Sequence, residues 1–512
     1  MKPNFLFIVT DQHRADYLGC AGHPVLKTPH IDSIAASGTM FDRFYVANPV
    51  CMPNRSAILT GRYSSISGIR HNGIPLPLEA NTFVDVMRAG GYDTSLIGKS
   101  HLQCTLDGDP EIGANPAGQG PLSNARRRPE GRYDQELEST WEKKGEAAIS
   151  LPYYGFSHVD LLSGHGDEAG AAHLIDQRKA LGDPESLRGA ENQMPHDYTC
   201  PQAIRTRIPE EQHSTAWVRD RAIDYLSDAK RQENPFFAFV SFPDPHHPFS
   251  PPGKYWEMYD PDDMQVPASF YQRSELPPPH LKWLREQGEF GKAAYGAAMV
   301  TERQAQEGIA LTCGMISMID DAVGEILDTL RSQGLSENTI VVFTADHGDF
   351  LGDHGMILKG PMHYQSTIRV PFIWSEPGRM GEGVQSRLSS SVDISRTILN
   401  RAGLQPYWGM QGQDLFDAQA RDSLLVEDEG NRASLGFETP PRVRTLITDL
   451  YRMSIYQDQL WGELYDLKKD PGEITNLWDD PEYANIKADL QFRLLQEMTR
   501  ACDSSPWPDA MA

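Results

Sequence analysis

The stretch NFLFIVT, Asn4–Thr10, is apolar at almost every position and does not alternate between apolar and polar residues. A strand of this kind is buried on both faces, as happens in a parallel sheet that helices cover on each side. The stretch TIVVFTA, residues 339–345, has the same character. We therefore predict an α/β fold with a large, mostly parallel mixed β-sheet sandwiched by helices.

Further apolar runs and helical patterns surround these two strands. The additional predicted strands are residues 94–98, 236–242 and 370–374, and the predicted helices between the strands are residues 82–89, 214–231 and 309–331. This alternation of strands and helices is typical of βαβ units. A long polar segment rich in Gly, Pro and Arg, about residues 105–212, is expected to be an insertion over one edge of the sheet.

The pattern changes after about residue 400. Short strands are predicted at residues 444–449, 451–456 and 462–467, followed by a helix at residues 482–501. Short strands joined by short links indicate an antiparallel meander. Because 512 residues exceed what one hydrophobic core usually holds, we expect a larger domain at 1–400 and a smaller C-terminal α+β domain with an antiparallel sheet at 401–512.

The composition narrows the possible partners. A net charge of −24 argues against nucleic acid and anionic membranes, because both require a basic surface. No apolar run is long enough to span a bilayer, and no signal-peptide cleavage site follows the first residues. Six Cys without close pairs or regular spacing fit a reducing compartment. We therefore expect a cytoplasmic protein.

Carboxylates follow two of the buried strands. Asp11 and Gln12 come directly after the first strand, and Asp346 and His347 come directly after TIVVFTA. Either Asp alone could cap a helix or a turn, but ligands of open α/β sheets bind at the carboxyl ends of the strands. Oxygen donors with one imidazole suit a divalent cation, and Mn²⁺ or Ca²⁺ is favoured over zinc because no thiolate cluster is present.

Cations and histidines follow other strands of the predicted sheet. These residues are Lys99 and His101 after the strand at 94–98, His246 and His247 after the strand at 236–242, and Lys359 after a glycine-rich run. Each side chain alone is more often solvated than functional. Their common position at strand ends favours a functional role.

The stretch NPVCMPNRSAILTGR, residues 48–62, places Cys51 at the start of a predicted helix. Pro53 suits the first turn and Gly61 ends the helix, so the helix dipole favours an anion near Cys51. Arg55 lies one turn further on, where its guanidinium can hold the residue at 51 or the group that it attacks. An inert buried Cys is one alternative. A phosphatase-type thiolate nucleophile is another, but that loop needs a longer gap than the three residues between Cys51 and Arg55.

The sequence CMPNR at residues 51–55, followed by TGR at residues 60–62, resembles the C-x-P-x-R…TGR signature of the type I sulfatases of the alkaline phosphatase superfamily. The segments TPHIDSIAASGTMF, GKSHL, SFPDPHHPF, TADHGDFLGDHGMILKG and GELYDLKKDPGEITNL resemble that family too. The resemblance covers most of the chain outside the predicted insertion. It implies an alkaline-phosphatase-like fold. It also implies that a formylglycine-generating enzyme oxidises Cys51 to Cα-formylglycine, whose hydrate is the nucleophile.

The resemblance implies one metal site and a set of catalytic residues. The metal ligands would be Asp11, Gln12, Asp346, His347 and an oxygen of the residue at 51. Cys51 would become the nucleophile, and Arg55 and Lys99 would hold its hydrate in place. His246 and Lys359 would assist the leaving oxygen, and His101 would deprotonate the second hydroxyl of the covalent hemiester.

Three features depart from the usual sulfatase pattern. Gln12 replaces the second carboxylate of many sulfatases and, with His347, resembles the phosphonate monoester hydrolase branch, which favours Mn²⁺ over Ca²⁺. Lys99 and His101 instead resemble the sulfatase branch. Asn54 stands at the fourth position of the signature, where Ser or Ala is usual. The mixture indicates a promiscuous site.

The sequence therefore predicts a metal-dependent hydrolase of aryl or alkyl sulfate monoesters. The alternative is a phosphonate monoester hydrolase or phosphodiesterase with sulfatase side activity, which Asn72 favours because it matches a substrate-contacting asparagine of the phosphonate enzymes. A third hypothesis is a non-catalytic relative in which Cys51 stays a thiol. Relatives usually form homo-oligomers, and we expect the same of this chain.

Overall fold

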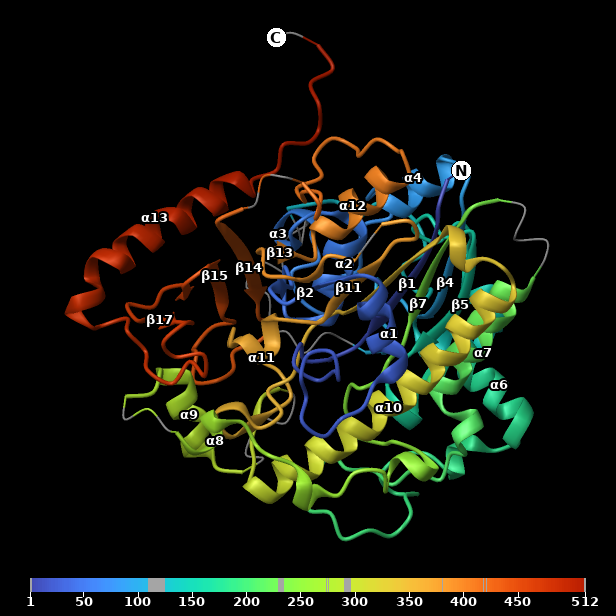
Figure 1. Ribbon diagram of the computed structural model, residues 1–512, viewed down its shortest axis with the longest axis horizontal. Coiled ribbons are helices and arrows are strands. Elements are labelled where there is room, and N and C mark those ends of the chain that lie inside the picture. Colours follow the sequence, from blue (N-terminus) through green and yellow to red (C-terminus); the bar gives the residue numbers. More distant parts are fainter. Residues whose placement is uncertain are drawn as a thin grey trace.

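A mixed sheet forms the centre of the protein (Figure 1). The computed structural model describes residues 2–108, 125–228, 234–272, 274, 276–289, 296–379, 381–417, 419 and 421–510. Within them the sheet has nine strands in the order β12-β2-β11-β9-β1-β7-β4-β5-β6. Its strands are β1 (Asn4–Thr10), β2 (Thr39–Phe41), β4 (Asp93–Lys99), β5 (His158–Ser163), β6 (Gly170–Ala171), β7 (Phe236–Ser241), β9 (Thr339–Ala345), β11 (Phe372–Ser375) and β12 (Gly383–Gln385). The predicted fold class is confirmed.

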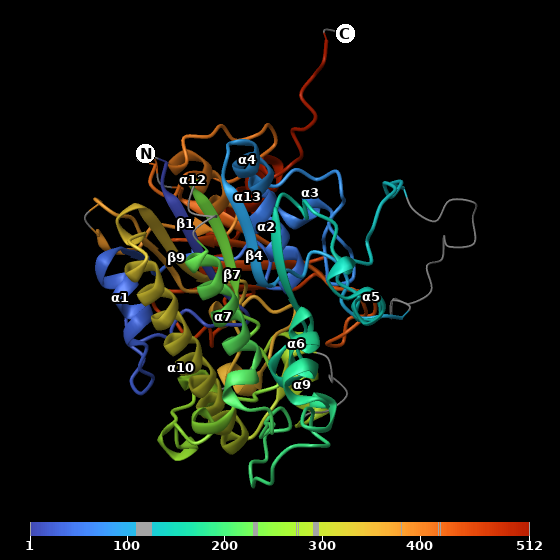
Figure 2. The ribbon, with the colours of Figure 1, turned by 90° about the vertical axis from the view of Figure 1, so that its right-hand side faces the viewer.

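Helices cover both faces of this sheet (Figures 1 and 2). On one face lie α2 (Cys51–Thr60), α4 (Phe83–Ala89) and α12 (Asp393–Arg401), and on the other lie α1 (Pro29–Ser37), α7 (Ser214–Ser227) and α10 (Glu302–Ser332). Phe5, Phe7 and Val9 of β1 pack with the first group, whereas Leu6 and Ile8 pack with the second. Successive side chains of a strand point to opposite faces, so β1 is apolar throughout because both faces are buried.

The central strands run parallel and therefore end at one edge of the sheet. Strand β1 pairs in parallel with β9 and β7, and β4 pairs in parallel with β7 and β5. The last residues of these strands, Thr10, Lys99, Ser241 and Ala345, lie at the same edge. This edge is where an open α/β sheet binds its ligands.

The predicted strands are all present, with small shifts in their ends. Strands β1 and β9 have the predicted bounds, whereas β11 starts two residues later than predicted and runs antiparallel to β9. Helix α10 begins at Glu302, well before the predicted residue 309, because Thr301 and Gln304 form a capping box at its start. Residues 109–124 of the predicted insertion and residues 229–231 of the predicted helix at 214–231 lie outside the described residues.

A second sheet of four antiparallel strands follows in the C-terminal part of the described chain. It consists of β14 (Ser423–Glu429), β15 (Arg442–Thr448), β16 (Tyr451–Tyr456) and β17 (Gly462–Asp466), and α13 (Ala484–Arg500) packs against β14 and β15 (Figure 1). The predicted antiparallel sheet and terminal helix are confirmed, but β14 was not predicted. The domain boundary near residue 400 stays a prediction.

Shorter elements lie in the segments between the main strands and helices. They are β3 (Phe44–Tyr45), α3 (Ser64–Ser67), α5 (Glu138–Lys144), α6 (Ala172–Leu181), α8 (Ala268–Tyr271), α9 (Pro279–Gln287), β8 (Ala298–Met299), β10 (Met356–Ile357), α11 (Gln365–Ile368) and β13 (Ser389–Ser390). Strand β5 lies within the predicted insertion, yet it extends the large sheet beside β4. Among the described helices, none combines the length and the apolarity that crossing a membrane needs.

Candidate active site

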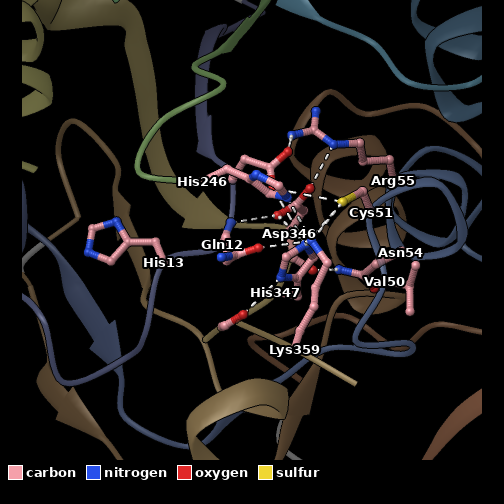
Figure 3. A network of polar contacts seen from close by, with 12 residues as sticks. Gln12, His13, Val50, Cys51, Asn54, Arg55, His246, Asp346, His347 and Lys359 are labelled. Atoms are coloured by element: carbon pink, nitrogen blue, oxygen red, sulfur yellow. Dashed lines mark hydrogen bonds and ion pairs between the residues drawn. The ribbon is translucent and has the colours of Figure 1, made fainter. Parts of the chain in front are cut away.

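The carboxyl ends of the parallel strands bring the predicted site residues together (Figure 3). Asp11 follows β1, Asp346 and His347 follow β9, and Cys51 is the first residue of α2. One ligand atom from each of these four residues lies within 4.8 Å of the other three, and all four residues are buried. Segments that are far apart in the sequence thus meet at one point.

The local sequence of α2 presents Cys51 to this point. Val50 precedes the helix in an extended conformation, and the helix ends at Gly61, whose φ of 63° is in the left-handed region that glycine favours. The Asn54 amide donates a hydrogen bond to the carbonyl oxygen of Asp346 at 2.6 Å. The unusual Asn54 of the signature therefore joins α2 directly to the end of β9.

Arg55 is buried and holds the two carboxylates of the site. Its Nε donates to Asp346 at 2.8 Å, and an Nη donates to Asp11 at 3.3 Å. Another hydrogen bond, of 2.8 Å, runs to the Ser241 hydroxyl at the end of β7. Burial lowers the pKa of Arg55, but Asp346 and Asp11 outweigh burial and raise it. The guanidinium is therefore a fixed cation beneath Cys51.

Lys359 is the centre of a second group of contacts (Figure 3). Its Nζ donates to Gln12 Oε1 at 2.9 Å and lies 2.9 Å from His246 Nε2 and 3.0 Å from His347 Nε2. The same Nζ lies 3.4 Å from Cys51 Sγ. One ammonium group thus reaches both the residue at 51 and the imidazole of His246.

The charges around Cys51 favour an anion there. Burial and the Asp11 carboxylate raise the pKa of the Cys51 thiol, but Lys359, His347 and Lys99 together outweigh them and hold it well below its usual value. Burial also raises the pKa of Asp11, and Lys99 is the foremost of the cations that hold it well below the ordinary value. Position 51 is therefore electropositive enough to stabilise an oxyanion.

Gln12 has a fixed orientation in this network. Its backbone φ is 62°, and its Nε2 donates to the Asp349 carboxylate at 2.5 Å and lies 3.1 Å from His247 Nδ1. Burial raises the pKa of Asp349 to about 6 and lowers that of His247 to about 3. Because the nitrogen is engaged in this way, the amide oxygen of Gln12 faces Lys359.

His165 is a further member of the cluster that the sequence analysis missed. Its Nε2 lies 2.5 Å from Lys99 Nζ and 3.8 Å from Asp11, and its ring stacks on His246 with centroids 3.6 Å apart and planes 11° apart. Lys99 also donates to Asp11. His165 therefore contacts both a predicted cation and a predicted leaving-group residue.

Two predicted residues occupy more peripheral positions. The backbone N–H of His101 donates to Glu136 at 2.9 Å, and its ring Nδ1 is buried without a hydrogen-bond partner among the described residues. Asn72 Oδ1 accepts from the Met52 N–H at 3.1 Å, in the first turn of α2. His13, which follows Gln12 in the sequence, points away from the cluster (Figure 3).

The sequence does contain a signal for His165. It comes two residues after β5, so it occupies a strand end like the other site residues. This strand begins with the partly polar residues HVD and lies in the long polar segment that we interpret as an insertion. For that reason β5 was not predicted as a strand, and His165 was not recognised as a strand-end residue. Asp349 follows His347 in the run DHGD and is a strand-end carboxylate in the same sense.

Asp11, Asp346, His347 and the residue at 51 fit a divalent cation. Burial and the neighbouring Asp11 raise the pKa of Asp346, because two adjacent buried carboxylates repel each other, and a cation between them would relieve that repulsion. Their oxygens and one imidazole nitrogen converge within 4.8 Å. Oxygen donors with one imidazole suit Mn²⁺ or Ca²⁺ better than a thiolate-preferring metal.

Comparisons with known proteins identify the family of this chain. The family model named Sulfatase matches residues 3–404, and a model of the N-sulphoglucosamine sulphohydrolase C-terminal region matches residues 352–500. An arylsulfatase of Clostridium perfringens is 28% identical over 517 residues, which cover 97% of this chain and 95% of that protein. The multifunctional alkaline phosphatase superfamily protein PehA of Trinickia caryophylli is 26% identical over 527 residues, 96% of this chain and 95% of that protein.

Among solved structures, the phosphonate monoester hydrolase of Agrobacterium radiobacter is similar with a TM-score of 0.76 and 26% identity, covering 98% of this chain and 96% of that one. The fold and the strand-end site thus define an alkaline-phosphatase-like hydrolase. This chain belongs to the sulfatase family, and it is a sulfuric ester hydrolase.

Proposed function

We propose that this protein hydrolyses sulfate monoesters through a formylglycine made from Cys51 by a formylglycine-generating enzyme. Members of the sulfatase family generally use a divalent metal and a formylglycine. The observation that carries the proposal is the position of Cys51, which starts α2 beside Asp11, His347 and Lys359. The sulfur in the structure stands where the hydrate oxygens of the modified residue would lie.

The reaction would begin with one hydroxyl of the hydrate attacking the ester sulfur in line. Arg55 and Lys99 hold the charge of the attacking group, and a covalent hemiester forms as the bond to the leaving oxygen breaks. His246, which lies 2.9 Å from Lys359 Nζ, would deliver a proton to the leaving oxygen while the Lys359 ammonium stabilises its charge. The alcohol then departs.

Release of sulfate needs a base for the second hydroxyl of the residue at 51. We assign this step to His101, whose buried Nδ1 has no hydrogen-bond partner among the described residues. Removal of the proton restores the carbonyl of formylglycine, and the electron pair of the breaking C–O bond leaves with the sulfate. An unmodified thiol has no second hydroxyl and could not complete this elimination.

A bound divalent cation would act as a Lewis acid that lowers the pKa of the hydrate and polarises a substrate oxygen. Asp11, Asp346 and His347 would hold it together with the residue at 51, and Gln12 would supply a neutral amide oxygen. A neutral ligand lowers the negative charge of the site, and for that reason we favour Mn²⁺ over Ca²⁺.

A phosphonate monoester hydrolase or phosphodiesterase is the second candidate. It is supported by Gln12 with His347, and by the likeness to the phosphonate monoester hydrolase of Agrobacterium radiobacter. Steady-state kinetics with 4-nitrophenyl sulfate and 4-nitrophenyl phenylphosphonate, which share one leaving group, measure the preference. A larger kcat/KM for the phosphonate would reverse the order of the two candidates.

Mass spectrometry of the peptide that spans residues 51–62 tests the nucleophile. In enzyme co-expressed with a formylglycine-generating enzyme, the peptide should lose the mass that separates a thiol from an aldehyde, and sulfatase activity should rise with the converted fraction. Full activity in protein whose Cys51 is entirely unmodified would refute the mechanism.

A further inference from the structure

A cavity of about 720 Å³ opens next to the reacting residue. Val50, Asn72 and Lys359 line the side nearest to Cys51. Further lining comes from α9 and from the end of β14 with its following loop, which contribute Trp283, Asp428 and Phe437 among others. The alcohol part of an ester bound at Lys359 would extend into the cavity along these residues, which we call the cavity wall (Trp283 and residues 428–438).

Asp428 places a weakly compensated carboxylate on the cavity wall. Asp428 is only 3% exposed. Among the described residues its carboxylate forms an ion pair with His363, whose Nε2 lies 3.7 Å from a carboxylate oxygen. That Nε2 is buried without a hydrogen-bond partner among the described residues, while Nδ1 lies 2.8 Å from the Thr445 hydroxyl. A carboxylate that lines the cavity and has only this long ion pair in the described part of the chain can accept a hydrogen bond from a donor on a ligand.

The neighbouring Glu429 shows what full compensation looks like in the same strand. Its carboxylate lies 2.9 Å from Arg444, 3.4 Å from Arg442 and 3.5 Å from Arg70. These cations leave Glu429 little need for a further donor. Asp428 is therefore the carboxylate of the pair that would respond to the charge of a ligand.

The aromatic residues of the cavity wall are held in place by the loop. Gly436 has a φ of 80°, and a Cβ at that position would lie 2.9 Å from Trp283 Cδ1, so the backbone packs directly on the indole. Phe437 stacks on the buried His280 of α9 with centroids 6.5 Å apart. The wall thus offers a fixed apolar surface beside the Asp428 carboxylate.

We propose that the cavity binds a leaving alcohol that carries a hydrogen-bond donor, an ammonium or hydroxyl group, beside an apolar ring, and that has no second anionic group. The inference rests on the proposed function, because it takes Lys359 as the point where the sulfate ester is cleaved. The cations of the strand-end cluster hold the sulfate, and the cavity wall carries the carboxylates Asp428, Glu429 and Glu438 together with Arg432. Of these carboxylates, Asp428 is the one placed to receive the donor. A polysulfated alcohol would meet that carboxylate with like charge.

Four aryl sulfates that differ only at the 4-position test this proposal. The substituents are aminomethyl, hydroxymethyl, methyl and carboxyl. For each ester, kcat/KM of the wild type is divided by kcat/KM of Asp428→Asn. Because both proteins cleave the same ester, this ratio does not depend on the intrinsic reactivity of its leaving phenol. A hydrogen bond to a charged partner corresponds to about tenfold, so this ratio should be about tenfold larger for the aminomethyl than for the methyl ester.

The remaining esters and a control variant sharpen the result. The hydroxymethyl ester should lie between the aminomethyl and methyl esters, and the carboxyl ester should show a ratio below that of the methyl ester. Asp458→Asn makes the same charge change at an exposed position of the turn between β16 and β17, which does not line the cavity, and should leave all four ratios within about twofold of one another. Equal ratios in Asp428→Asn overturn the proposal.

Binding of the free phenols separates this inference from the proposed function. Isothermal titration with 4-(aminomethyl)phenol and 4-methylphenol should show that the wild type prefers the amine and that Asp428→Asn loses the preference. If no sulfate ester is cleaved but this preference holds, the proposed function fails and the binding site stands. If the preference is absent from the wild type, the binding site fails whatever the activity.

Discussion

The strand-end cluster and the cavity wall both border one cavity, but they are built in different ways. In the cluster, short contacts join three cations, Arg55, Lys99 and Lys359, to carboxylates and imidazoles. These carboxylates and imidazoles follow the ends of β1, β7 and β9. In the wall, the carboxylate of Asp428 has a single ion-pair partner within the described part of the chain, His363 at 3.7 Å, and Asp428 lies on β14 just before a loop. Side chains that are held by many short contacts are preorganised for bond cleavage. A polar group with few contacts of its own is available to bind a ligand and so to select it.

The largest expected effect is the loss of the nucleophile. Cys51→Ala should lower kcat by at least about 10⁴-fold, because the whole covalent route depends on residue 51. The fold should survive, since Ala is compatible with the first turn of α2. Steady-state assays and thermal unfolding measure the two quantities. Cys502→Ala removes an exposed thiol elsewhere and serves as the control.

Cys51→Ala also tests the division between the two regions. The variant should still bind 4-(aminomethyl)phenol in preference to 4-methylphenol, because Cys51 is not one of the residues that line the cavity. If substantial turnover persists in Cys51→Ala, the cluster performs chemistry that does not involve this residue.

Removal of the metal should have the next largest effect. The cation would lower the free energy of the charged transition state by several kcal/mol. Dialysis against a chelator should therefore lower kcat by about 10³-fold. Adding back Mn²⁺ should restore more activity than Ca²⁺, and elemental analysis should find one ion per chain. Asp346→Asn should bind less metal at equal concentration. Undiminished activity in demonstrably metal-free protein would contradict the assignment.

His165 should have an intermediate effect, and two variants separate its two contacts. His165→Phe keeps a ring over His246 but cannot accept a hydrogen bond from Lys99, whereas His165→Asn keeps an acceptor but loses the stack. A bond to a charged donor is worth more than a stacked ring pair, so His165→Phe should lower kcat by about tenfold or more. His165→Asn should lose less.

The kinetic constants distinguish positioning from damage to the fold. If His165 fixes the Lys99 ammonium, kcat should fall in His165→Phe while KM changes little, and the unfolding temperatures of the two variants should be similar. Equal losses in both variants would assign the effect to the stack on His246 or to packing.

The strand-end cluster could largely be located from the sequence, and the reason is geometric. The runs at β1 and β9 are apolar throughout, and parallel strands end at one edge, so Asp11 and Asp346 had to lie near each other. His165 obeys the same rule, but β5 begins with polar residues and was hidden in the polar segment. His101 itself has a φ of 57°, and no periodicity of the sequence indicates where its ring points.

The cavity wall could not be predicted in the same way. Strand β14 has the sequence SLLVEDE, whose acidic end does not indicate a strand, although all seven residues are buried in the structure. The roles of Asp428 and Glu429 depend on which arginines reach them from other segments. Gly436 and Trp283 meet only because the loop packs on α9. Such contacts between loops and helices carry no repeating signal along the chain.

The smallest expected effect is on the stability of the fold, and it concerns His280, which packs against Phe437 of the cavity wall. His280 of α9 is buried, its two ring nitrogens have no hydrogen-bond partner among the described residues, and its ring contacts Tyr456 and Trp461. Burial lowers the pKa of His280 to about 4. The unfolded chain therefore binds more protons between about pH 6.5 and 4, so the stability of the folded state falls as the pH drops through this window.

His280→Phe should remove that dependence, because phenylalanine keeps the ring contacts and does not titrate. The variant should be more stable than the wild type by up to about 3 kcal/mol near pH 4 and nearly equal to it at pH 7.5. Thermal unfolding across this pH range measures the difference, with exposed His30→Gln as the control. Activity at pH 7.5 should stay within about twofold, since His280 belongs to the support of the wall. A difference between the variant and the wild type that does not grow at acid pH would show that His280 is not held neutral by its surroundings.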